Sequence, residues 1–210
     1  MAAYPLVLTQ LDRVRVVVVG GGAVAERKVV GLIAGGARPV VISPDLTVEL
    51  TSWHAAGALE WLVRCYAAGD LAGAFLAVAA TNDQVVNAQV ATEAQARGVL
   101  ANIGDEPGAG SFTTTATVRR GDLLIAVTTN GASPALTARI RRELEAEYGA
   151  EYATLLALLR DLRAGPARDL PPARRIALLR QLASDQVLAW VRAGQIERIH
   201  ALIEQMIRDA

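Results

Sequence analysis

Residues 14–28 read VRVVVVGGGAVAERK, and this stretch decides the fold of the first half of the chain. The β-branched run Val14–Val19 predicts a buried parallel strand, because such strands are covered on both faces and read as continuous apolar runs. After three glycines, apolar residues at helical spacing predict a helix over Ala23–Ala34, ended by Gly35-Gly36. A second strand over Arg38–Ser43 completes a strand–helix–strand unit of the length that a right-handed crossover needs.

The alternation of strands and helices continues to about residue 105. We expect helices over 46–57 and 84–97, and further strands over 59–63, 74–80 and 99–103. This order is typical of an open parallel sheet with helices on both faces. The sequence therefore predicts an α/β protein of the Rossmann-type doubly wound class.

The character of the chain changes after residue 105. Residues 119–122 predict a turn, 123–129 a strand, and Ser133-Pro134 the start of a helix that runs to about Tyr148, because serine is a good N-cap and proline suits the first helical position. Helices follow from Glu151 onward. We therefore expect three parts: a Rossmann domain over 1–112, a small α+β region over 113–150, and a C-terminal helical domain over 151–210.

Composition restricts the class of partner and the compartment. The chain has 21 basic and 21 acidic side chains, so no overall charge draws it to nucleic acid or to an anionic membrane. Its one cysteine, Cys65, excludes an intramolecular disulfide and is interpreted as a packing residue. No apolar run reaches the ~20 residues that a membrane span needs, and no signal peptide is evident. A cytoplasmic location is expected.

The glycine turn predicts a dinucleotide site. Residues 20–25 fit the pattern G-x-G-x-x-A between a predicted strand and a predicted helix. In that pattern the first glycine permits the turn, the second lets the diphosphate approach the backbone, and the small third residue lets the helix pack on the strand. The alternative is a tight turn without a ligand. The candidate cofactor contacts here are Gly20, Gly21, Gly22, Ala23, Val24 and Ala25.

Two further groups of residues extend this predicted site. An acid about 20 residues after the glycines usually binds the ribose, and here Ser43 and Asp45 occupy that place. Asp45 either contacts the ribose or caps the next helix. Thr81, Asn82 and Asp83 follow the fourth strand, where they can orient the nicotinamide ring. The alternative is that Thr81 and Asp83 only cap the helix from Gln84. NAD is favoured over NADP.

Four segments together resemble a known family. They are GGGAVAERK at 20–28, AATND at 79–83, NIGD at 102–105 with Ser111-Phe112 after it, and TTNGASP at 128–134. In order and spacing they are similar to the precorrin-2 dehydrogenase family, the N-terminal module of siroheme synthases, over roughly residues 4–150. The C-terminal helices resemble the family only in being helical.

The resemblance implies a reaction and a catalytic residue. It implies oxidation of precorrin-2 to sirohydrochlorin with hydride transfer to NAD, and in bifunctional members the insertion of Fe(II), a substrate, to give siroheme. Asp105 matches the family's catalytic aspartate, and a carboxylate at the carboxyl end of a strand can accept a proton. The alternative is that Asp105 closes a turn beside Pro107 and Gly108.

The resemblance also indicates which residues border the tetrapyrrole. Thr129 stands where some members carry serine, although Ser133 is equally explained as a helix cap. Arg119, Arg120 and Arg139 are candidates to bind substrate carboxylates, or else solvated surface residues, and Thr115 departs from the proline that the family often has. The candidate substrate contacts are Asn102, Ser111, Phe112, Thr113, Thr129, Asn130, Gly131 and Ser133.

A metal site in the protein is not predicted. The tetrapyrrole brings its own four nitrogen ligands, and His54 and His200 have no partner at ligand spacing.

The resemblance also implies an oligomeric state, because members of the family are homodimers. A helical stripe of Leu136, Ile140 and Leu144 packs either internally or against a second subunit. We therefore expect a homodimer with dimerisation through 113–150. An NAD-sensing regulatory domain without catalysis remains the alternative function. A short-chain reductase would need a Tyr-x-x-x-Lys pair that is not found.

Overall fold

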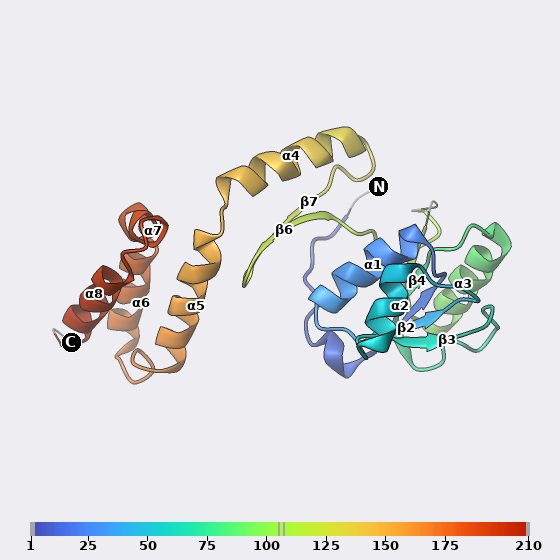
Figure 1. The fold of residues 1–210 in the computed structure, drawn as a ribbon, viewed down its shortest axis with the longest axis horizontal. Coiled ribbons are helices and arrows are strands. Elements are labelled where there is room, and N and C mark those ends of the chain that lie inside the picture. The colour runs from blue at the N-terminus through green and yellow to red at the C-terminus, as the bar shows by residue number, and fades with distance from the viewer. Residues whose placement is uncertain (1–2, 105, 107, 209–210) are drawn as a thin grey trace. The chain divides into compact units, whose positions relative to one another are not determined.

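The computed structural model of the chain describes residues 3–104, 106 and 108–208 (Figure 1). These residues form two compact units that divide between Thr114 and Thr115. The N-terminal unit ends at Thr114, and the C-terminal unit begins at Thr115.

The N-terminal unit is built on a parallel sheet of five strands in the order β3-β2-β1-β4-β5. In the centre of the sheet, Val18 of β1 pairs with Val41 of β2 on one side and with Val78 of β4 on the other. The predicted α/β doubly wound class is confirmed, because every one of these pairings is parallel. The strands are β1 (Arg15–Val19), β2 (Val40–Ile42), β3 (Glu60–Leu62), β4 (Ala74–Ala79) and β5 (Leu100–Ile103).

Both faces of this sheet are covered. Val16 and Val18 of β1 lie in one apolar cluster with residues of the first two α-helices. Val17 and Val19 lie in a second cluster with residues of the third α-helix. This alternation along β1 explains why its apolar residues are continuous, since each face of the strand needs its own apolar side chains. The helical elements of the unit are η1 (Leu11–Arg13), α1 (Ala23–Ala34), α2 (Val48–Ala55) and α3 (Gln84–Arg97).

The C-terminal unit begins with an antiparallel hairpin of β6 (Ala116–Arg120) and β7 (Leu123–Val127). The predicted turn over 119–122 is wrong in its extent. Arg119 and Arg120 belong to β6, because pairing continues to Arg120 opposite Leu123 and leaves only Gly121 and Asp122 for the turn. Gly121 has a φ of 57°, which suits a two-residue hairpin loop.

Helices complete the C-terminal unit. Leu155, Leu162, Leu178, Leu182 and Ile199 are buried in an apolar cluster that the last four helices form among themselves. Among the described residues, no helix has the length and apolar character needed to cross a membrane. The helices are α4 (Pro134–Glu147), α5 (Glu151–Ala164), α6 (Pro172–Leu182), α7 (Asp185–Arg192) and α8 (Ile196–Arg208).

Candidate functional site

A pocket of about 490 Å³ lies in the N-terminal unit where the loops after β1, β2, β3 and β4 meet. This is the carboxyl edge of the parallel strands, where open α/β sheets bind their ligands. The lining includes the candidate residues Ser43, Asp45 and Asn82. The full lining is Val19, Gly20, Gly21, Gly22, Ile42, Ser43, Pro44, Asp45, Leu46, Thr47, Cys65, Tyr66, Ala80, Thr81, Asn82, Asp83 and Val86.

The three glycines of the turn have different reasons to be glycine. A Cβ on Gly20, whose φ is 114°, would lie 2.4 Å from the carbonyl oxygen of Ala80. A Cβ on Gly21 would lie 2.0 Å from the carbonyl oxygen of Asp45. A Cβ on Gly22 would meet no atom of the described residues within 4 Å. The folded chain thus explains Gly20 and Gly21, whereas the open space beside Gly22 fits the close approach of a ligand.

The start of α1 leaves backbone donors beside this open space. Gly22 is the N-cap of α1 and has no side chain that could accept from the first helical amides. Such amides, together with the helix dipole, favour an anion such as a diphosphate. Ala23 and Val24 are exposed and Ala25 is fully buried, and none of these three candidate contacts lines the pocket. Ala25 packs in the apolar cluster between α1 and the sheet.

The loop after β2 carries the candidate ribose contacts. Ser43 is buried, and its carbonyl oxygen accepts a hydrogen bond of 2.9 Å from the indole nitrogen of Trp61. The side-chain oxygen of Thr47, not Asp45, caps α2 by accepting from the backbone N–H of Leu50 at 3.2 Å. Asp45 is exposed at the pocket. The capping interpretation of Asp45 is wrong, and its contact with the ribose stays a prediction.

The loop after β4 is held by the helix that follows it. The carboxylate of Asp83 caps α3, accepting from the N–H groups of Val85 at 2.8 Å and Val86 at 3.2 Å. The Thr81 hydroxyl donates to the side-chain oxygen of Asn87 at 2.8 Å, and the Asn87 amide donates back to the Thr81 carbonyl at 3.0 Å. Capping by Asp83 is confirmed, and Thr81, Asn82 and Asp83 nevertheless line the pocket.

Several residues that help to build the pocket are missing from the sequence predictions. Cys65 is exposed and lines the pocket, so its interpretation as a packing residue is wrong. Tyr66 and Thr47 line the pocket as well, and Asn87 holds Thr81 from the first turn of α3. Among these, a signal exists only for Thr47, which lies near the start of the helix predicted over 46–57 and has the residue type of an N-cap.

The candidate residue Asn102 of β5 and the candidate residues that follow this strand form a connected group. Asn102 is buried and its side-chain amide donates to the carbonyl oxygen of Phe112 at 3.1 Å. Its own side-chain oxygen is buried without a partner in the described part of the chain. The Ser111 hydroxyl accepts from the N–H of Ala101 at 2.8 Å. These bonds fasten the segment Ser111-Phe112 along β5, and Thr113 follows it in an exposed position.

One lysine ties the end of the N-terminal unit to α1. The ammonium of Lys28 donates to the hydroxyl of Thr114 at 2.7 Å. Burial and the neighbouring charge of Arg27 lower the pKa of Lys28 from its ordinary value.

The catalytic candidate Asp105 and its neighbour Pro107 lie outside the described residues, so the role of Asp105 stays a prediction.

The remaining candidate substrate residues lie in the C-terminal unit, in the loop between β7 and α4. The hydroxyl of Thr129 accepts from the N–H of Ser133 at 3.0 Å and lies 3.0 Å from the hydroxyl of Thr137. Ser133 caps α4 by accepting from the N–H of Leu136 at 3.2 Å, which confirms its capping interpretation. Asn130 and Gly131 both have positive φ, of 52° and 83°, and make the tight turn of this loop.

Two of the three candidate arginines already have partners in the C-terminal unit. Arg120 donates to the carbonyl oxygen of Glu145 at 3.0 Å, and Arg139 forms an exposed ion pair of 2.7 Å with Glu143. Arg119 is exposed on β6. Within the described residues, no group of three or more His, Cys, Asp or Glu side chains is placed to hold a metal ion.

Comparison with known proteins connects both units to one family. Residues 7–116 match the family described as "Putative NAD(P)-binding", and residues 120–147 match "Sirohaem biosynthesis protein central". The siroheme synthase of Photorhabdus laumondii is 32% identical over 208 residues, which are 99% of this chain and 44% of that protein. The siroheme synthase of Azotobacter vinelandii is 35% identical over 197 residues, which are 93% of this chain and 42% of that protein. The chain thus spans less than half the length of these curated relatives.

A solved structure matches the chain from end to end. It is described as "SirC, precorrin-2 dehydrogenase" and has 29% sequence identity and a TM-score of 0.80, covering 99% of this chain and 100% of its own. The N-terminal unit is therefore an NAD(P)-binding domain. The chain belongs to the family that comprises precorrin-2 dehydrogenases and the N-terminal modules of siroheme synthases.

Proposed function

We propose that this chain is a precorrin-2 dehydrogenase, which oxidises precorrin-2 to sirohydrochlorin with NAD as the hydride acceptor. The observation that carries this proposal is the match to the structure described as a precorrin-2 dehydrogenase, which covers essentially the whole of both chains. The glycine turn and the pocket at the carboxyl edge of the sheet support the same function.

The residues of the pocket fit a dinucleotide. The open space at Gly22 and the uncapped amides of α1 suit the diphosphate, and Asp45 is exposed where a ribose hydroxyl would be bound. The carboxylate of Asp45 would repel the extra phosphate of NADP, which supports NAD as the cofactor. Bound NAD supplies the nicotinamide ring that accepts the hydride.

The oxidation also needs an acceptor for a proton. Removal of a hydride and a proton from precorrin-2 yields sirohydrochlorin, NADH and H⁺. We propose Asp105 as the base, since it follows β5 by two residues and its carboxylate can take the proton directly. Asn102 and the Ser111-Phe112 segment after β5 are proposed to border the macrocycle, together with the loop 128–133.

The test is a cell-free reaction of the purified protein with precorrin-2 and either NAD or NADP. Fluorescence of NADH or NADPH should appear only when both precorrin-2 and the matching cofactor are present, and NAD should give the higher rate at equal concentration. Binding of NAD measured by calorimetry, with no precorrin-2-dependent NADH, would instead support the alternative of an NAD-sensing domain. Faster reaction with NADP would contradict the assignment of Asp45.

Iron insertion stays a prediction that rests on the family resemblance. The same reaction decides it if Fe(II) is added after oxidation is complete. A siroheme absorption spectrum that forms faster than in a control without protein would establish the second activity. An unchanged sirohydrochlorin spectrum would limit the chain to dehydrogenation.

We also propose that the chain forms a homodimer through the region 113–150. None of the fourteen residues of α4, all of them described, is buried, although Leu136, Ile140 and Leu144 form an apolar stripe on this helix. Leu136 is 45% exposed. Such a stripe favours contact with another apolar surface. Sedimentation at micromolar concentration is expected to show a dimer, and a monomer alone would contradict the proposal.

A further inference from the structure

The connection from β3 to β4 crosses the sheet without a helix. We call it the crossover segment, residues 63–73. All of its residues are described, and they form turns, a bend and irregular backbone. A parallel crossover is usually a helix, whose internal hydrogen bonds satisfy its own amides. The backbone amides of the crossover segment need other partners.

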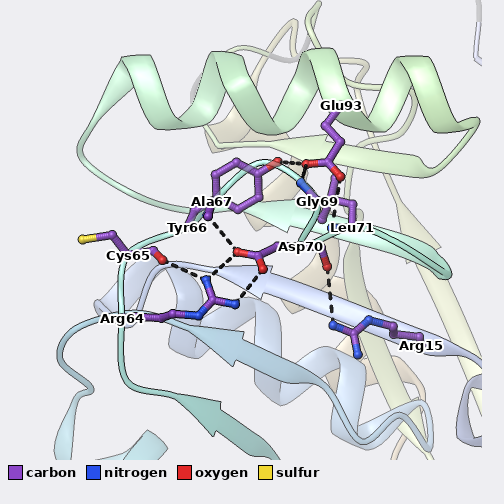
Figure 2. Close-up of polar contacts among 9 residues, drawn as sticks. All are labelled: Arg15, Arg64, Cys65, Tyr66, Ala67, Gly69, Asp70, Leu71 and Glu93. Carbon is purple, nitrogen blue, oxygen red and sulfur yellow. Dashed lines mark hydrogen bonds and ion pairs between the residues drawn. The ribbon is translucent and has the colours of Figure 1, made fainter.

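The carboxylate of Asp70 supplies some of these partners from inside the segment. It accepts two hydrogen bonds from the guanidinium of Arg64, at 2.6 and 2.7 Å, and one from the N–H of Ala67 at 2.8 Å (Figure 2). The bonds from Arg64 hold the pKa of Asp70 below its ordinary value. Arg15 of β1 donates to the Asp70 carbonyl at 3.4 Å. The segment is thereby folded into a compact loop next to β1.

The carboxylate of Glu93 holds the same segment from α3. It accepts from the N–H of Gly69 at 2.9 Å, from the N–H of Leu71 at 3.3 Å and from the hydroxyl of Tyr66 (Figure 2). Arg97 donates to it at 2.6 Å. Burial opposes the ionisation of Glu93, yet these hydrogen bonds keep its pKa below the ordinary value. The ionised carboxylate therefore joins α3 to three points of the crossover segment.

This attachment acts on the pocket through Tyr66. Tyr66 and Cys65 line the pocket, whereas Glu93 is outside the lining. The ring of Tyr66 is buried in the apolar cluster that includes Val90 and Ala94 of α3, and its hydroxyl is fixed by Glu93. Burial, followed by the hydrogen bond to Glu93, raises the pKa of Tyr66 from its ordinary value, so the phenol stays a donor. The position of Tyr66, which forms a wall of the pocket, thus depends on Glu93, which does not line the pocket itself.

The sheet order indicates which half of a dinucleotide this wall would meet. The crossover segment leaves β3, which lies at the edge of the sheet beyond β2. In doubly wound folds the residue after the second strand binds the ribose of the adenosine half, so the β2–β3 side of the pocket takes that half. Cys65 and Tyr66 are then on the adenosine side.

We propose that Glu93 is a positioning residue for the adenosine half of the dinucleotide, because it fixes Tyr66 and the adjacent backbone as a wall of the pocket. This inference rests on the proposed function, since it requires a dinucleotide in this pocket. Glu93→Gln keeps the length of the side chain and one oxygen. That oxygen can replace Oε2, which accepts from Tyr66 and Gly69, or Oε1, which accepts from Leu71 and Arg97, but it cannot replace both. One pair of donors then faces the NH₂ group of the amide.

The test compares three ligands by calorimetry: NAD, ADP-ribose and nicotinamide mononucleotide. The variants are Glu93→Gln, Tyr66→Phe and the double variant, with Gln95→Ala as a control on the exposed side of the same helix. Glu93→Gln should weaken NAD and ADP-ribose alike, by about tenfold, and leave nicotinamide mononucleotide unchanged. The double variant should be no weaker than Glu93→Gln, because the bond that Tyr66→Phe removes is one of those that Glu93 accepts. Gln95→Ala should bind as the wild type does.

Different outcomes identify different failures. A lower melting temperature of Glu93→Gln with unchanged dissociation constants would make Glu93 purely structural and overturn the proposal. Equal weakening of all three ligands would overturn it as well, since it would show general damage to the pocket. If Glu93→Gln does not fold, the same comparison of the three ligands is made with Tyr66→Phe alone. This variant removes only the hydroxyl that donates to Glu93. A wild-type protein that binds none of the three ligands would refute the proposed function itself.

Discussion

Gly22→Ala is expected to weaken NAD binding by at least about tenfold while the protein keeps its fold. The added methyl group would point into the open space that the diphosphate is proposed to occupy, where no atom of the described residues lies within 4 Å. The backbone of Gly22, with φ −87° and ψ −174°, is extended and open to alanine. The cost to stability should therefore be limited to the weaker N-cap, at most about 1 kcal/mol.

Gly21→Ala is the matched control for this experiment. Its Cβ would lie 2.0 Å from the carbonyl oxygen of Asp45 and 2.8 Å from the hydroxyl oxygen of Ser43. Backbone must move to relieve this overlap, and we expect a loss of about 3 kcal/mol or more in the free energy of unfolding. Urea unfolding and calorimetry of both variants separate the two effects. Wild-type affinity for NAD in Gly22→Ala would place the dinucleotide away from this turn.

Local patterns explain why the N-terminal unit could be predicted from sequence. The run of valines in β1 is continuous because both faces of this strand are buried. The bounds of α1 and α3 agree with the predicted helices at both ends. Each of these features depends on neighbours along the chain. The β6–β7 turn was placed wrongly because the pairing of Arg120 with Leu123 is a property of two strands together, which one strand's composition does not reveal.

The same reasoning explains what was missed at the pocket. Cys65 follows a short edge strand, and nothing in its local sequence indicates that the chain turns back along the pocket after β3. Glu93 and Arg97 have the spacing of an ordinary exposed helix pair, so sequence alone gives no reason to connect Glu93 with Tyr66, 27 positions earlier. Asp83 shows the reverse case: a residue that caps a helix also lines the pocket, so capping does not exclude contact with a ligand, and that contact stays a prediction.

Asp105→Asn is expected to lower kcat for precorrin-2 oxidation by about 10²- to 10⁴-fold, the range typical of losing a general base. Asparagine has nearly the same shape but cannot accept the proton that must leave the macrocycle along with the hydride. NAD affinity should not change, because the glycine turn and the loops after β2 and β4 are intact in this variant. The measurement is single-turnover NADH formation at saturating NAD.

Glu106→Gln is the matched control, since Glu106 is the neighbouring carboxylate and is exposed. It should react at the wild-type rate, which would separate loss of a base from loss of negative charge in this segment. A wild-type rate in Asp105→Asn would remove Asp105 from the mechanism without touching cofactor binding. Proton removal would then need another acceptor at this edge of the sheet, and Asp83 would be poorly suited, because its carboxylate already accepts from two amides of α3.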